Sequence, residues 1–367
     1  PPNNYKLFGG FVVLKDKFDY FIEISKKNVD TINLFIVTNV DGVTTDFNDY
    51  ENYSITSEFL SEFELEELQE GFLKFGFRPK VFYDELEFIQ YILSQKHLIN
   101  NKLTIVFNMA QKGDKVGRKS LIPAFCDLNN IIYVNSNPYV VSLCRNKYHS
   151  GNILAHHGLP TPNSWLYTKQ TKWINENRPP QNSKVIVKLN NESASIGIDE
   201  NNILNFSSET EDMIEQMSIH YQQDIIIQQF IEGFEVEVPI INSSEPLCLL
   251  PMGIKIADQE FLGNNILTYD KRKNDDYKYY NFNDIDHALC QKIIKTSKET
   301  ITILGIQGFG RIDYRINTQN EFFITDIATN PHIVHHSAFF HAFKHLNYSY
   351  SEMLAVLIGT KLSNLGF

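Results

Sequence analysis

Two aspartates near the carboxyl end of the chain have the spacing that most clearly points to chemistry. Residues 311–316 and 321–327 alternate between apolar and polar side chains, and residues 317–320, Asn-Thr-Gln-Asn, have the composition of a turn. This pattern predicts a β-hairpin. Asp313 and Asp326 then lie at mirrored positions on paired strands, so both carboxylates can point into one cleft. Oxygen ligands of this kind suit a hard divalent cation such as Mg2+.

A guanidinium accompanies the two carboxylates. Arg311 lies two residues before Asp313 and therefore faces the same side of its strand. Such a set suits phosphoryl chemistry, in which a metal ion neutralises phosphate oxygens and an arginine stabilises a developing anion. The alternative is a surface hairpin with solvated charges, since charge pairs on hairpins are common.

Two other segments could bind a nucleotide. Lys188 ends an apolar strand and precedes Leu-Asn-Asn-Glu-Ser-Ala-Ser-Ile-Gly, a loop whose N–H groups could hold phosphates together with the lysine. The alternative is a lysine at the solvent boundary. Residues 228–235, Gln-Gln-Phe-Ile-Glu-Gly-Phe-Glu, are either a buried strand with its turn, or a hinge whose backbone binds adenine while a carboxylate binds ribose.

Histidines are concentrated in one short region. Five of the eleven histidines fall between residues 332 and 345, and His341 and His345 lie one helical turn apart. A zinc site is one interpretation, but no cysteine or carboxylate accompanies these histidines at ligand spacing. Histidines that line a substrate pocket are the favoured interpretation.

The elements that must position these residues alternate between strands and helices. In the first part of the chain, apolar runs predict strands, and helices between them predict a parallel sheet with crossover helices. The predicted strands are residues 6–14, 32–37, 79–83, 102–108 and 131–134. Residues 258–280 are polar and tyrosine-rich and are predicted to form a mobile loop that closes over the site. We expect three α/β domains, at residues 1–134, 135–226 and 227–367.

The composition bounds the class of protein. The chain has 367 residues, of which 43% are hydrophobic, and a net charge of -11. Such a charge argues against nucleic acid or an anionic membrane as the main partner. The four cysteines lie far apart, as expected of reduced thiols. No run approaches the ~18 apolar residues of a membrane span, and a cytoplasmic location is expected.

Taken in order, these segments resemble the motifs of the ATP-grasp superfamily, and most closely the D-alanine:D-alanine ligase family. The matching segments are Lys147, the Val-Ile-Val-Lys strand with its Ser/Gly loop, Ile-Ile-Ile-Gln-Gln-Phe-Ile-Glu-Gly-Phe-Glu-Val-Glu-Val, Gly-Arg-Ile-Asp-Tyr-Arg and the strand with Asp326. One motif would mean little, but five in register are specific. The resemblance runs from about Leu103 to the end of the chain. It implies an ATP-grasp fold with ATP between the central and carboxy-terminal domains.

The resemblance also implies roles for single residues. It assigns ATP binding to Lys147, Lys188, Ser195, Gln228, Ile231 and Glu235, metal binding to Asp313 and Asp326, and catalysis to Arg311 and Ser337. Asn330 is a further candidate metal ligand, because it lies near the position of a family asparagine that this chain lacks. His336-Ser337 matches a His-Ser pair whose serine holds the carboxylate of the attacking amino acid. The alternative for Ser337 is that it caps the helix that follows.

The sequence also departs from the family pattern. Ala328 stands where the family has a metal-binding asparagine, and Asn330 lies close enough to replace it. Ala194 stands where the family has the first loop serine, and the amino-terminal segment that helps hold the first D-alanine has no convincing match. Ala194 and the unmatched amino-terminal segment argue against D-alanine as the first substrate.

The expected function is therefore ATP-dependent ligation of a carboxylate to an amine through an acyl phosphate, with ATP and Mg2+, or Mn2+, as cofactors. The expected partners are a small carboxylate and an amino acid, with neither nucleic acid nor membrane, and a homodimer is possible. One alternative is a true D-alanine:D-alanine ligase. Another is a nucleotide-binding protein that has lost catalysis, which Ala328 suggests.

Overall fold

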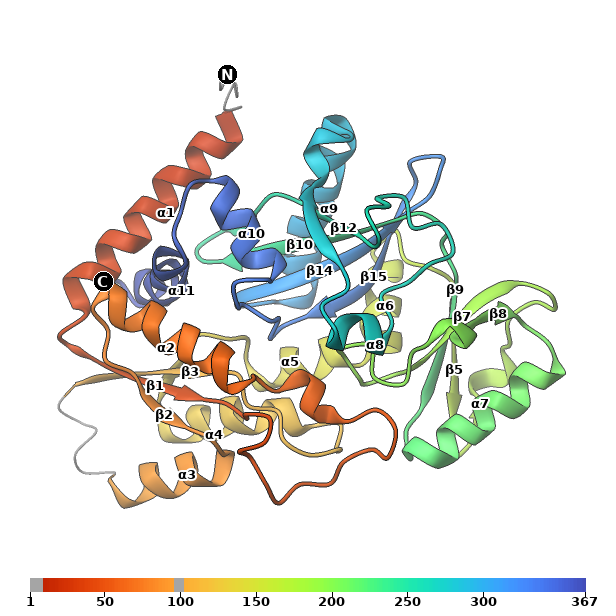
Figure 1. The fold of residues 1–367 in the computed structure, drawn as a ribbon, viewed down its shortest axis with the longest axis horizontal. Helices are drawn as coiled ribbons and strands as arrows, with labels where there is room; N and C mark the ends of the chain where they lie inside the picture. The colour runs from red at the N-terminus through yellow and green to blue at the C-terminus, as the bar shows by residue number, and fades with distance from the viewer. Residues whose placement is uncertain (1–8, 96–101) are drawn as a thin grey trace.

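The computed structural model describes residues 9–95 and 102–367, which form three β-sheets with helices packed on them (Figure 1). The sheet that comes first in the sequence lies at the lower left of Figure 1, the second lies at the right, and the third occupies the upper centre. The functional site depends on how these three sheets meet.

The first sheet is parallel, as predicted, with the strand order β2-β1-β3-β4. Along β1, Leu34 and Ile36 pack on one face and Phe35 and Val37 on the other, so both faces are buried, as is usual for parallel sheets. Helices α3 and α4 cover one face, and α1 and α2 lie on the other. The bounds are β1 Ile32–Val37, α2 Glu62–Phe75, β2 Lys80–Phe82, α3 Glu85–Ser94, β3 Leu103–Asn108, α4 Leu121–Asn129 and β4 Ile132–Tyr133.

The strand predicted for residues 6–14 is wrong in its described part. Helix α1, Gly9–Asn28, begins there instead, and residues 6–8 lie outside the described residues. Leu14, Phe18, Phe21 and Ile24 are all buried and repeat at the spacing of one helical face. This face packs on the carboxy-terminal helix α11. The described part of the apolar run, from Gly9 onward, is the start of a helical pattern, and only the residues after it reveal the period.

The second sheet is antiparallel, with the order β6-β5-β9-β7-β8. Helix α7 packs on it through Ile214 and Tyr221, and so do Ile55 and Phe59, which come from the amino-terminal part of the chain. The bounds are β5 Ser164–Thr168, β6 Lys172–Trp173, β7 Lys184–Leu189, β8 Ile203–Asn205, α7 Ser208–Tyr221 and β9 Ile225–Gln229. Strand β9 runs across the boundary expected between residues 226 and 227, and the domain boundaries themselves stay a prediction.

The third sheet is also antiparallel, with the order β13-β12-β10-β14-β15, and β11 pairs with the far end of β10. Helix α9 packs on one face, and α10 and α11 pack on the other, where they meet the first sheet in one continuous core. The bounds are β10 Phe234–Asn242, β11 Pro246–Cys248, β12 Met252–Lys255, β13 Lys278–Asn281, α9 His287–Leu304, β14 Gly308–Ile316, β15 Phe322–Ala328, α10 Ala338–His345 and α11 Tyr350–Asn364.

Shorter elements connect the sheets around the site. Helices α5, Pro138–Arg145, and α6, Lys147–His156, follow the first sheet. The predicted loop at residues 258–280 contains helix α8, Tyr269–Lys273, and the start of β13, so it has more regular structure than its composition indicated. Lys271, Arg272 and Lys273 all lie in α8.

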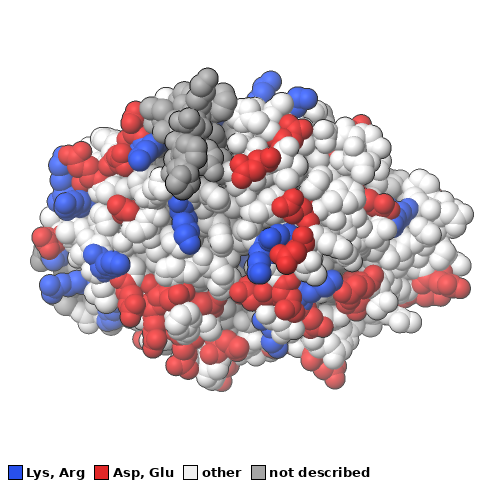
Figure 2. Space-filling model, turned by 45° about the horizontal axis from the view of Figure 1, so that its top comes forward, with Lys and Arg blue, Asp and Glu red and all other residues white. Residues whose placement is uncertain are grey.

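The charge of the surface and the unpaired state of the cysteines agree with what the composition led us to expect. Acidic side chains gather along the lower edge of the face in Figure 2, and basic side chains are scattered over it. All four cysteines are buried and unpaired. Among the described residues, none of the helices has the length and apolar character needed to cross a bilayer.

Candidate functional site

A cavity of about 540 Å³ lies between the second and third sheets, with residues of the amino-terminal part along one side. All of the predicted site residues but one line it. Those lining it are Lys147, Lys188, Ser195, Gln228, Ile231, Glu235, Arg311, Asp313, Asp326 and Asn330. The exception is Ser337, which the cavity wall does not include.

The predicted hairpin forms, and its two aspartates are register partners. Strands β14 and β15 pair antiparallel with Asp313 opposite Asp326, so both carboxylates lie on the face that borders the cavity. The register shifts next to this pair, and Thr325 donates a hydrogen bond from its hydroxyl to the Asp313 carbonyl at 3.2 Å. The bulge interrupts the regular pairing beside the two acids, and pairing continues on both sides of it.

Arg311 binds Asp313 through two parallel hydrogen bonds, at 2.7 Å from Nε and 2.8 Å from a terminal nitrogen. The same guanidinium lies 3.2 Å from Glu237, a buried residue of the neighbouring strand β10. Burial raises the pKa of Asp313, and Glu237 adds to this effect, although Arg311 opposes it. The sequence prediction had missed Glu237, which lies two residues after Glu235 and therefore on the same face of β10.

Lys147 begins helix α6 and donates a hydrogen bond to Asp326 at 2.7 Å. The Asn146 side chain caps this helix, and the Lys147 N–H is bound by the Asn190 carbonyl, so the lysine is held at both its backbone and its ammonium. Burial alone would raise the pKa of Asp326, but the Lys147 ammonium outweighs it and holds that pKa below its usual value.

Lys188 lies near the end of β7, and its ammonium donates to the Gln228 side chain on β9 at 2.9 Å. Burial and, second to it, the nearby Lys147 ammonium lower the pKa of Lys188 to about 8. Among the described residues, no carboxylate forms an ion pair with Lys188. Of the two lysines predicted to bind phosphate, Lys147 is paired with Asp326, whereas Lys188 has no ion-pair partner in the described part of the chain to balance its charge.

The loop after β7 is fastened to the amino-terminal part of the chain by a buried ion network. Glu192 in this loop accepts hydrogen bonds from Arg118 at 2.8 and 3.0 Å and from Arg145 at 3.0 Å. Arg118 also donates to Glu58 at 3.0 Å. Burial opposes ionisation, but Arg145 and Arg118 hold the pKa of Glu192 below its usual value. Sequence reasoning missed this network because its members come from separate segments.

Within that loop the backbone turns sharply. Ala194 and Ser195 both have positive φ, 52° and 56°, which is uncommon for residues with a side chain. The Ser195 hydroxyl donates to the Leu267 carbonyl at 2.7 Å, so the loop is tied to the segment before α8. Of the three basic residues of α8, Arg272 and Lys273 line the cavity, whereas Lys271 pairs with Glu200 at 2.9 Å.

The predicted hinge is held by an arginine that the sequence prediction had missed. Arg315 on β14 pairs with Glu235 at 3.1 Å, and it also donates to the Ile231 carbonyl at 3.1 Å. Among the described residues, the Ile231 N–H has no hydrogen-bond partner. This N–H and the Glu235 carboxylate are therefore the hinge groups that remain available at the cavity.

Asn330 and Ser337 lie on the segment that follows β15. The Asn330 side-chain oxygen accepts a hydrogen bond from Asn135 at 3.0 Å and borders the cavity near Asp326. Ser337 is buried, and its hydroxyl accepts a hydrogen bond from the Phe340 N–H at 3.2 Å. Ser337 therefore makes the contact of a helix cap, which was the second of the two alternatives for it.

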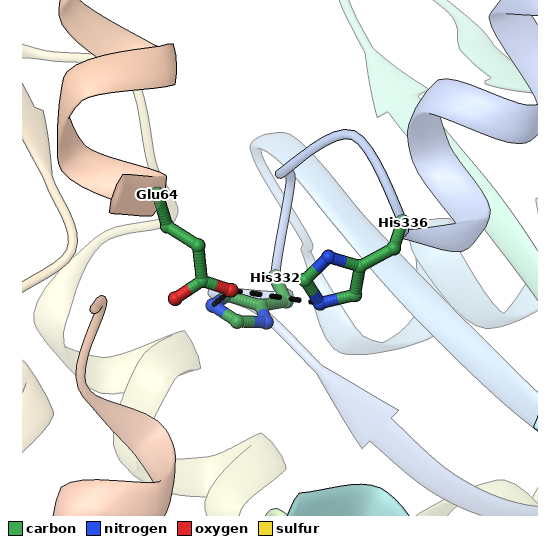
Figure 3. A group of neighbouring side chains, drawn as sticks. All are labelled: Glu64, His332 and His336. Atoms are coloured by element: carbon green, nitrogen blue, oxygen red, sulfur yellow. Dashed lines mark ion pairs between the residues drawn. The ribbon is translucent and has the colours of Figure 1, made fainter. Parts of the chain in front are cut away.

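The histidines divide into two sets. His332 and His336 line the cavity and face Glu64 of α2 (Figure 3). His335 pairs with Glu67 at 2.9 Å and stacks on Tyr350. The carboxylate that the sequence did not show near the histidines thus comes from the amino-terminal part of the chain.

Comparisons with known proteins agree with this architecture. Residues 153–359, more than half of the chain, match the family model described as "D-ala D-ala ligase C-terminus". A D-alanine–D-alanine ligase of Natranaerobius thermophilus is 26% identical over 252 residues, which are 66% of each chain. An uncharacterized protein, y4sG, of Sinorhizobium fredii is 22% identical over 258 residues, 68% of this chain and 72% of the relative.

Solved structures show the same fold. The D-alanine–D-alanine ligase from Bacillus anthracis complexed with ATP superposes with a TM-score of 0.67 at 16% identity, covering 90% of this chain and 97% of that one. The VanG D-Ala:D-Ser ligase from Enterococcus faecalis gives a TM-score of 0.64 at 15% identity, with 90% and 99% covered. The expected ATP-grasp fold is confirmed. With its fold and more than half of its residues matched, this chain belongs to the D-alanine–D-alanine ligase family of ADP-forming ATP-grasp ligases.

Proposed function

We propose that the protein joins a small carboxylate to the amino group of an amino acid through an acyl phosphate, with release of ADP and phosphate. The observation that carries the proposal is the register pair Asp313 and Asp326, which faces the cavity together with Arg311 and Lys147. Paired carboxylates and buried cations around one cavity are what phosphoryl transfer from a nucleotide needs.

ATP fits the groups along the cavity between the second and third sheets. Lys147 and Lys188 would hold its phosphates, next to the sharply turned backbone at Ser195. At the other end, the free N–H of Ile231 would bind adenine, and Glu235 would accept from the ribose hydroxyls. Gln228 positions the Lys188 ammonium through its side-chain oxygen.

The donor set for a divalent cation consists of Asp313, Asp326 and the side-chain oxygen of Asn330. Two carboxylates and an amide oxygen are hard ligands, which fit Mg2+ and also Mn2+. Asn330 would take the place of the asparagine that is Ala328 in this chain. When bound, such an ion would neutralise charge on the phosphate oxygens.

The reaction has two steps. A carboxylate oxygen of the first substrate attacks the γ-phosphorus of ATP, the bond to the bridging oxygen breaks, and ADP leaves. The amine nitrogen of the second substrate then attacks the carbonyl carbon, phosphate leaves with the bonding pair, and the nitrogen loses a proton. Arg311 would stabilise the negative charge of the transferred phosphoryl group in the first step and of the tetrahedral intermediate in the second.

Water must be kept from the acyl phosphate, which it would hydrolyse. The segment with α8 places Arg272 and Lys273 on the cavity wall, and Arg272 lies 3.8 Å from Glu237. This segment would close over the bound substrates and exclude water.

The substrates of this reaction would be small molecules. That two copies of the chain form a homodimer stays a prediction.

The test is ADP release by the wild-type protein with ATP, Mg2+ and a panel of carboxylates and amino acids in pairs. Asp326→Asn, which keeps the shape and removes the charge, sets the background. ADP release above that background that requires both a carboxylate and an amine supports the proposal. Release with D-alanine alone would identify a D-alanine:D-alanine ligase. Nucleotide binding without release for any pair would identify a degenerate nucleotide-binding protein.

A further inference from the structure

Three metal-ligating side chains converge on the cavity wall away from the aspartate pair. Glu64 comes from the first turn of α2, whereas His332 and His336 come from the segment between β15 and α10 (Figure 3). One ligand atom from each lies within 4.8 Å of the other two. The three residues thus join parts of the chain that are far apart in the sequence.

The Glu64 carboxylate is oriented by the helix that carries it. One oxygen, Oε2, accepts hydrogen bonds from the Ser61 N–H at 2.7 Å and from the Ser61 hydroxyl at 2.9 Å. The Glu64 N–H in turn donates to the Ser61 hydroxyl oxygen, which completes the capping box of α2. The other oxygen, Oε1, faces both imidazoles, as Figure 3 shows. A carboxylate with one oxygen fixed and the other directed at two imidazoles is arranged like a metal ligand with its outer support in place.

The two imidazoles approach this oxygen without bonding to it. Nε2 lies 3.5 Å away in His336 and 3.8 Å away in His332, beyond the ~2.7–3.2 Å of an N–H···O hydrogen bond. The His332 Nε2 is buried and has no hydrogen-bond partner among the described residues. With bonds of about 2.0–2.2 Å, tetrahedral ligand atoms lie roughly 3.4 Å apart. An ion between the three groups would account for these separations.

We propose that Glu64, His332 and His336 bind a divalent transition metal such as Zn2+, with the remaining coordination position open to the cavity. Two imidazole nitrogens and one carboxylate oxygen are the protein ligands of a known class of zinc site with an open position. Mg2+ prefers oxygen ligands only, so this site selects a different ion from the aspartate pair. The site goes beyond the proposed ligase function and is independent of it.

The experiment is a titration of the whole chain with Co2+, a spectroscopic substitute for Zn2+, in a large excess of Mg2+. Equilibrium dialysis measures affinity, and ligand-field absorption reports imidazole ligation. We expect one strongly bound ion. Glu64→Gln and His336→Asn should each weaken binding by ~10-fold or more and remove the absorption band. Glutamine can still complete the capping box, so Glu64→Gln should keep the fold.

The matched control is His335→Asn, which removes the neighbouring imidazole, paired with Glu67 and stacked on Tyr350. It should leave Co2+ binding unchanged, as should Asp326→Asn. Zn2+ should raise the Tm of the wild type and not that of Glu64→Gln, so the inference stays testable if His336→Asn does not fold. Equal Co2+ affinity in the wild type and Glu64→Gln, or loss of the band in Asp326→Asn, would overturn it.

Discussion

At the scale of single residues, the cations of the cavity differ in how their charge is balanced. Lys147 is paired with Asp326 and Arg311 with Asp313, whereas the partner of Lys188 is the neutral Gln228 side chain. A buried charge without a counter-ion is costly, and a phosphate group placed there removes that cost. Lys188 should therefore contribute more to nucleotide affinity than its position at a strand end indicates.

The first prediction concerns Lys188→Ala. Loss of a charge-assisted hydrogen bond worth about 1.5–3 kcal/mol should weaken ATP binding by ~10-fold or more. Calorimetry with ATP measures the change. Lys172→Ala is the matched control, because Lys172 lies in the same sheet, is largely exposed and pairs with Glu215. Unchanged affinity in Lys188→Ala would show that the phosphates bind elsewhere.

The second prediction concerns pH. The pKa of Lys188 is lowered to about 8 by burial and by Lys147, and only the protonated ammonium attracts phosphate. Nucleotide affinity should therefore be present below pH 8 and fall as the pH rises through 8, by roughly tenfold between pH 7 and pH 9. Lys188→Arg stays protonated over this range and should lack the dependence. Parallel pH profiles for both proteins would contradict the assignment.

At the scale of elements, the hairpin β14–β15 was the most predictable part of the site. Its alternating pattern and polar turn predicted the hairpin, whereas the bulge beside Asp313 sets the register that places Asp313 opposite Asp326. Period-two alternation is a local property, so the sequence shows it directly. Helix α1 was missed because its apolar face becomes periodic only over about three turns, and the short apolar run at its start looked like a strand.

Ser337 provides the third prediction, because two roles were open for it. Its hydroxyl caps α10 through the Phe340 N–H, so Ser337→Ala should lower the free energy of unfolding by about 1 kcal/mol. Ser337→Asn, which keeps a capping oxygen, should restore most of it. Chemical denaturation measures both variants. A raised KM for the amine in Ser337→Ala, without loss of stability, would instead favour contact with the substrate carboxylate.

At the scale of the whole molecule, the site depends on contacts that no local pattern shows. Arg118 of the amino-terminal part pairs with Glu58 and with Glu192 of the loop after β7, and Glu64 meets the histidines that follow β15. Each of these residues, read alone, is a common surface charge, and only the folded chain brings them together. For this reason the residues of each motif were predictable, but the residues that join the motifs were not.

The fourth prediction concerns the buried ion network around Glu192, which connects the loop after β7 to the amino-terminal part of the chain. Glu192→Gln leaves the buried guanidinium groups of Arg118 and Arg145 without their shared carboxylate. Breaking a buried ion pair in this way should cost about 3–5 kcal/mol in the free energy of unfolding. The control is Glu200→Gln, whose exposed pair with Lys271 should contribute less than about 1 kcal/mol. Equal effects in urea denaturation would show that the network does not fasten the loop.

The central claim is that a carboxylate is activated as an acyl phosphate in this cavity. The most direct measurement uses the substrate pair that gives the fastest ADP release, with the carboxylate labelled with oxygen-18, and analyses the released phosphate by mass spectrometry. In the proposed reaction one carboxylate oxygen becomes the bridge to phosphorus and leaves with it. The predicted result is one oxygen-18 atom in each phosphate formed with product. Phosphate without label, formed together with the ligated product, would contradict the account.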